Sequence, residues 1–96
     1  MSSLLPVGIT VRTLNNLVNE LRGDDLWAER HSYSVRIMYK GLIVASLHFY
    51  PGYHEAVLRL YGDEEANRYV YSRVKSLTSK YLPNYTLRAV NIKHVL

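Results

Sequence analysis

Histidines and a short run of carboxylates are the residues of this 96-residue chain whose types could support a reaction. His48 and His54 lie on either side of a Pro-Gly pair, and the acids Asp63, Glu64 and Glu65 follow one another. Neither group has the spacing of a known metal site, and consecutive acids at the start of a helix are favoured by the helix dipole. The chain also lacks a nucleophile–base spacing and a phosphate-binding glycine loop. We therefore expect a protein that is not an enzyme, without catalytic residues, a metal site or a cofactor.

Arginine and tyrosine point to binding instead of to a reaction. The chain has 12 Lys and Arg against 8 Asp and Glu, and nine tyrosines against one phenylalanine. Clustered basic residues attract polyanions and release their counterions, while tyrosine stacks on bases. Strand alternation places several of these residues on one side of a sheet. The candidate nucleic-acid-binding residues are Arg36, Lys40, Arg59, Tyr61 and Arg88.

The first half of the chain predicts one helix followed by strands. Apolar residues recur every three or four positions over residues 11–22, with Thr10 suited to cap the start and Gly23 the end. Alternation begins at residue 33 and predicts a strand that turns at Lys40-Gly41 into a second strand over residues 42–50. A third strand is expected at residues 55–61. We expect Trp27 to plug the end of the core from a link between helix and sheet.

The second half predicts a helix and a last strand. Asp63 suits the cap of a helix that Pro83 stops near residue 81 or 82, and residues 85–92 alternate again. The expected fold class is α+β: a single domain over residues 1–96 in the order α-β-β-β-α-β, with residues 1–9 as an N-terminal arm. Both helices are expected on one face of a mostly antiparallel four-stranded sheet, although the pattern does not say which face.

The order of the first five elements, over residues 10–82, resembles that of the double-stranded-RNA-binding domain. That family holds phosphates with a lysine cluster at the start of its second helix and enters the minor groove with a histidine-bearing loop. The corresponding segments here are Asp63–Glu65 and Lys40-Gly41. The resemblance therefore implies a fold only, and no binding residue is transferred from it.

The composition favours a cytoplasmic protein. The absence of cysteine excludes a disulfide framework and fits a reducing compartment. The longest apolar run, residues 42–45, is far shorter than the ~20 residues of a membrane span, and the N-terminus lacks the pattern of a secretion signal. We expect no membrane association.

These observations leave two functional hypotheses. The first is a small nucleic-acid-binding protein, for DNA or RNA, that acts as a homodimer through the basic, tyrosine-bearing sheet surface. The alternative is a protein–protein interaction module, an adaptor or inhibitor of the kind that viruses and mobile elements encode, also a homodimer. Residues 42–47 or the C-terminal segment 90–96 could pair with a second copy as an edge strand. The surface could also be an ordinary solvated face whose charge maintains solubility.

Overall fold

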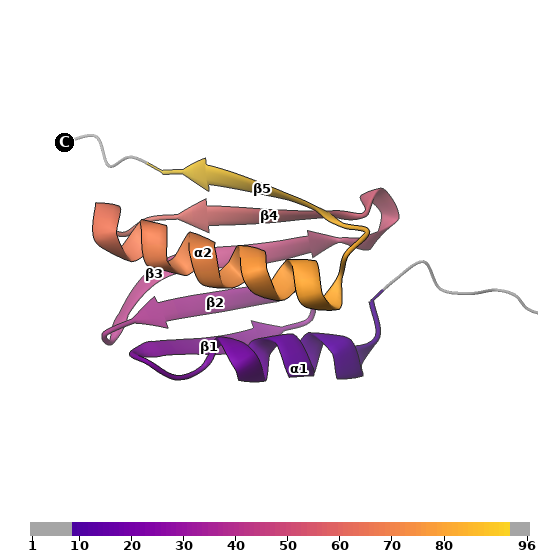
Figure 1. Cartoon of the computed structure of the whole chain (residues 1–96), viewed down its shortest axis with the longest axis horizontal. Helices are drawn as coiled ribbons and strands as arrows, with labels where there is room; N and C mark the ends of the chain where they lie inside the picture. The colour runs from indigo at the N-terminus through magenta and orange to yellow at the C-terminus, as the bar shows by residue number, and fades with distance from the viewer. Residues whose placement is uncertain (1–8, 93–96) are drawn as a thin grey trace, which may run out of the picture.

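The computed structural model describes residues 9–92, so the expected arm at residues 1–9 and the last four residues lie almost wholly outside the described residues. Two α-helices and five strands form one α+β unit (Figure 1). In chain order the elements are α1 (Val11–Leu21), β1 (Leu26–His31), β2 (Ser34–Tyr39), β3 (Leu42–Tyr50), a 3₁₀ turn η1 (Pro51–Tyr53), β4 (Glu55–Leu60), α2 (Glu64–Tyr81) and β5 (Thr86–Asn91).

The strands lie side by side in the order β1-β2-β3-β4-β5. The first four pair antiparallel, and β5 pairs parallel to β4 because α2 carries the chain back between them. Both helices lie on the same face of this sheet (Figure 1). The α+β class and the mostly antiparallel sheet are thus confirmed, whereas the expected four strands are in fact five.

The additional strand is β1, which the sequence pattern did not reveal. Its helix-facing side carries only two apolar residues, Leu26 and Ala28, before Arg30, so its alternation is weak. Trp27 lies on the opposite side of this strand and is 46% exposed, so the prediction that it plugs the core was wrong. With β1 present, four strands precede α2, and the order differs from that of the double-stranded-RNA-binding domain.

Local signals at the helix starts and at the β2–β3 turn behave as predicted. The Thr10 hydroxyl accepts a hydrogen bond from the Thr13 backbone N–H at 3.1 Å, and the Asp63 carboxylate accepts one from Ala66 at 2.8 Å. Lys40 and Gly41 both adopt positive φ, 52° and 83°, which a two-residue hairpin turn requires. The two caps fix where the helices begin, and the turn fixes where β2 ends and β3 begins.

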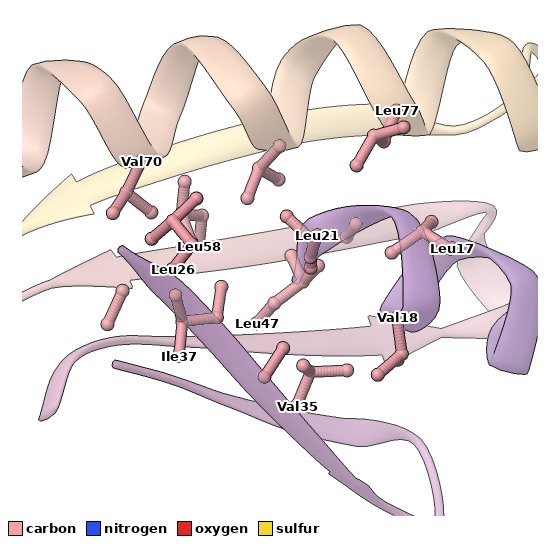
Figure 2. Packing of buried hydrophobic residues seen from close by; sticks show 14 of the residues in the cluster. Leu17, Val18, Leu21, Leu26, Val35, Ile37, Leu47, Leu58, Val70 and Leu77 are labelled. Atoms are coloured by element: carbon pink, nitrogen blue, oxygen red, sulfur yellow. The ribbon is translucent and has the colours of Figure 1, made fainter. Parts of the chain in front are cut away.

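The core lies between the two helices and the helix-facing side of the sheet (Figure 2). α1 contributes a leucine-rich stripe and α2 a stripe of smaller side chains, and both contact alternate residues of the strands. Fully or nearly fully buried members are Leu14, Leu17, Val18, Leu21, Ile37, Leu47, Phe49, Leu58, Val70 and Val74. Burial of these side chains is the main stabilising contribution to the fold.

A polar cluster joins the end of α1 to α2. The Glu20 carboxylate accepts hydrogen bonds from the Tyr81 hydroxyl and, at 3.0 Å, from the Lys80 ammonium. The Arg73 guanidinium donates to the Glu20 backbone carbonyl. The hydrogen bond from Tyr81, followed by that from Lys80, lowers the pKa of Glu20 below its ordinary value. Ionised Glu20 therefore links α1 to the end of α2.

Two leucines on the same strand should respond very differently to truncation. Leu47 is fully buried, whereas Leu42 is 70% exposed. Leu47→Ala should lower the free energy of unfolding by about 3 kcal/mol through lost transfer energy and a cavity. Leu42→Ala should change it by less than about 0.5 kcal/mol. Urea denaturation followed by circular dichroism measures both, and equal losses would contradict the core described above.

Glu20 should make the stability of the protein depend on pH in the acidic range. A carboxylate whose folded pKa is depressed contributes stability above its unfolded pKa and loses it as pH falls through the folded value. Wild-type protein should therefore lose stability below the ordinary carboxyl pKa more steeply than Glu20→Gln, and Tyr81→Phe should respond in between. Thermal unfolding at a series of acidic pH values measures this difference. An unchanged acid dependence in Glu20→Gln would show that the cluster contributes nothing.

Candidate nucleic-acid interface

The side of the sheet opposite the helices, called the open face here, is where most of the predicted basic residues meet. Strand register aligns Arg36 of β2 with Ser46 of β3, and Ser46 with Arg59 of β4. Since neighbouring strands are ~4.8 Å apart, the two arginines start from backbone positions about 10 Å apart, with a serine between them. The open face therefore presents two guanidinium groups on either side of a hydroxyl.

Tyr61 adds a second hydroxyl to this row. It follows β4, and its phenolic oxygen lies 2.9 Å from the Ser46 hydroxyl. A shallow depression of about 650 Å³ runs over this part of the sheet, with Arg36, Ser46 and Tyr61 in its lining. Its lining also includes Glu29, Arg30 and Ile43. The depression thus combines guanidinium groups, a carboxylate, hydroxyls and an apolar edge.

The neighbouring row of the open face contains Val57 between His48 and Arg88. Val57 is only 2% exposed although no helix covers this side, so the surrounding side chains bury it. The His48 ring lies against Tyr50, with centroids 4.7 Å apart, and its Nδ1 is hydrogen-bonded to the Ser34 hydroxyl. This row is therefore ordered by its own contacts.

A smaller depression of about 250 Å³ lies beside that row, at the end of the sheet near η1. Its lining includes Arg59 and Arg88 together with two tyrosines, Tyr50 and Tyr53. Tyr53 is 81% exposed, so most of its ring is accessible to a partner. Arginines next to accessible aromatic rings are the combination by which proteins hold a nucleic-acid backbone and stack on its bases.

Carboxylates offset part of this positive charge. Arg88 forms an ion pair with Glu55 at 3.6 Å, and Glu29 stands next to Arg36 in the β1–β2 register. Both acids lie on the open face. The potential of this surface is therefore positive but moderate, because three arginines share it with two glutamates.

Lys40 is separated from the other predicted site residues. It lies in the hairpin turn, and its ammonium nitrogen is 5.2 Å from the centroid of the Tyr39 ring. Tyr39 in turn packs against Tyr69 of α2, so this contact is at the helix-facing side of the hairpin. The structure thus brings together Arg36, Arg59, Tyr61 and Arg88, and leaves Lys40 at the end of the sheet.

Strand β1 supplies open-face residues that the sequence reasoning missed. Trp27 aligns with Met38 of β2, and Met38 with Ile43 of β3, forming an apolar row at the hairpin end. Trp27 and Ile43 are 46% and 56% exposed. The Arg22 guanidinium lies 4.2 Å from the Trp27 ring centroid. The alternation of Trp27 with Leu26 and Ala28 was the available signal for this placement.

Across residues 9–92, no three His, Cys, Asp or Glu side chains gather in a way that could hold a metal ion. Within that range there is also no helix long and apolar enough to span a membrane.

Comparisons with protein-family models, with curated protein sequences and with solved structures found no match to this chain.

Proposed function

We propose that this protein binds single-stranded nucleic acid on the open face of its sheet. The observation that carries the proposal is the row formed by Arg36, Ser46 and Arg59, with the Tyr61 hydroxyl beside Ser46. The face of a five-stranded sheet is wider than the ~12 Å major groove, which admits a helix or two strands, whereas a single strand can lie across it. DNA and RNA both fit this chemistry.

In this arrangement the arginines contact the backbone and the aromatic rings contact the bases. Arg36 and Arg59 bind phosphates through charge-assisted hydrogen bonds, and the Ser46 hydroxyl lies between them beside that of Tyr61. Tyr53, which is 81% exposed, is available for stacking at one end of the path. Such contacts tolerate many base sequences, since every base has a face on which to stack.

A cytoplasmic location and a homodimer belong to the same proposal. A chain without cysteine needs no oxidising compartment for its stability, and nucleic acid is abundant in the cytoplasm. A second copy would add its arginines to the same surface and strengthen a moderate positive potential.

One observation favours the alternative function, a protein–protein interaction module acting as an adaptor or inhibitor. Trp27 and Ile43 are exposed on either side of the half-buried Met38 on the open face, and aromatic residues and methionine are enriched at protein interfaces. Binding through this row would depend little on salt, whereas binding through the arginines would weaken as salt rises.

Removing the three arginines of the open face should abolish most binding. Arg36→Ala/Arg59→Ala/Arg88→Ala should weaken binding of a labelled single-stranded oligonucleotide by about tenfold or more at low salt. The slope of log affinity against log salt should decrease in magnitude by about 2, since each phosphate contact on a single strand contributes ~0.7 to that slope. Fluorescence anisotropy at several salt concentrations measures both effects, and unfolding curves verify that the variant is folded.

The matched control is Arg12→Ala/Arg68→Ala/Lys75→Ala, which removes the same charge from exposed helix positions. It should bind nearly as well as the wild type. Equal losses in both triple variants would attribute binding to net charge alone, and no binding by the wild type at low salt would end the proposal.

Neutralising the two glutamates of the open face should strengthen binding. Glu29→Gln/Glu55→Gln removes the negative charge beside Arg36 and Arg88, so affinity for the same oligonucleotide should rise about threefold to tenfold. Glu64→Gln/Glu65→Gln makes the same change at the exposed start of α2. The proposal predicts a clear difference between the two pairs, and equal responses would contradict it.

A further inference from the structure

The outer edge of β5 presents backbone groups without partners among the described residues. Thr86 and Ile92 donate their N–H groups to His54 and Leu60 on the β4 side, each at 2.9 Å. Because N–H and C=O directions alternate along a strand, the groups of the intervening residues point away from the sheet. These outward residues are Leu87, Ala89 and Asn91.

The opposite edge of the sheet, β1, is partly closed by its own chain. Gly23 exchanges both backbone hydrogen bonds with Leu26 at 2.9 Å, and the Arg22 side chain donates to the Ala28 carbonyl at 2.9 Å. These partners occupy outward groups of β1 that a foreign strand would need. The two edges therefore differ, and β5 is the one prepared to accept another strand.

We propose that β5 pairs antiparallel with β5 of a second copy of this chain, so that two sheets join edge to edge. A two-fold axis at Ala89 places Ala89 opposite its counterpart and Leu87 opposite Asn91 of the second copy. In this register all the outward N–H and C=O groups of the three residues are paired across the axis. Backbone pairing of this kind is a common mode of strand addition.

Side-chain charges select the same register. With the axis at Ala89, Arg88 faces Val90 of the second copy, and each Arg88 keeps its own partner Glu55. Moving the axis to Arg88 would place two arginines directly opposite each other, which is destabilising, and would leave Asn91 unpaired. Moving it to Val90 would leave Leu87 without a partner among the described residues. The strand is therefore complementary to itself, which favours a second copy over an unrelated strand.

The surface next to β5 can add to this contact. A groove of about 710 Å³ between α2 and β5 includes Tyr71, Ala89 and Ile92 in its lining. Glu64 and Arg68 also line the groove, but they pair with each other at 3.7 Å and so present no net charge to the second copy. The groove thus offers apolar area beyond the backbone bonds, which alone would bury less than a stable dimer needs.

The joined sheet would have one continuous open face. Each copy's Arg88 and Arg59 would lie near the junction, which brings the two basic surfaces described above side by side. The dimer itself does not depend on nucleic-acid binding, because it rests on the edge of β5 and on the groove beside it, and it is therefore tested with the protein alone.

The test is Ala89→Pro compared with Ala89→Val in the full chain. Proline removes an outward N–H without breaking the β4–β5 ladder, whereas valine keeps that N–H and suits a strand. Sedimentation velocity from about 1 to 500 µM protein should show a concentration-dependent dimer for the wild type and for Ala89→Val. Ala89→Pro should remain a monomer with an unchanged circular dichroism spectrum.

Hydrogen exchange of the wild type provides a second measurement that is independent of any variant's folding. The amides of Leu87, Ala89 and Asn91 should exchange at least about tenfold more slowly at the high concentration than at the low one. If Ala89→Pro is unfolded, hydrogen exchange of the wild type alone tests whether β5 pairs with a second copy. A wild type that stays monomeric, a dimer that persists in folded Ala89→Pro, or amides whose exchange is independent of concentration would overturn the proposal.

Discussion

Apolar contact between two helices and one side of the sheet is the constraint on which the rest of this structure depends. Leu17 and Leu21 of α1 and Val70 and Val74 of α2 are all buried against the strands. Because side chains alternate along a strand, fixing which residues face the helices also fixes which residues face away. The positions of Arg36 and Arg59 on the open face follow from the burial of their neighbours in the strand.

The open face has to be ordered without a covering layer. Its side chains instead cover one another, and Val57 is buried on that side by the side chains around it and not by a helix. The Ser34–His48 and Ser46–Tyr61 hydrogen bonds and the Arg88–Glu55 ion pair hold long polar groups over the strands. A surface ordered in this way loses less side-chain entropy when a partner binds, which favours a role in recognition.

Much of the fold could be predicted because local signals agreed with the tertiary contacts. The caps Thr10 and Asp63, the Lys40-Gly41 turn and the alternation of β2 and β4 each marked an element that the structure contains. β1 was missed because Arg30 occupies a helix-facing position, where hydrogen bonds to Asn15 and to the Ser32 carbonyl satisfy its guanidinium. A charged residue at such a position breaks the alternation on which strand prediction depends.

The candidate site was partly predictable for a related reason. Arg36, Arg59 and Arg88 sit within regular strands, so period-two alternation placed them together correctly. Lys40 lies in a turn with positive φ, where alternation from the preceding strand no longer applies. The bulge between β2 and β3 likewise shifts the register after Ile37, and no local pattern in the sequence signalled it.

The central claim, that the open face is the binding surface, is tested most directly by nuclear magnetic resonance. A single-stranded oligonucleotide is titrated into ¹⁵N-labelled protein, and the shifts of the backbone amides are followed. The account predicts that the largest changes cluster at Arg36, Ser46 and Arg59 and that α1 and the exposed side of α2 change little. Changes concentrated on the helices, or spread evenly over both sides, would contradict it.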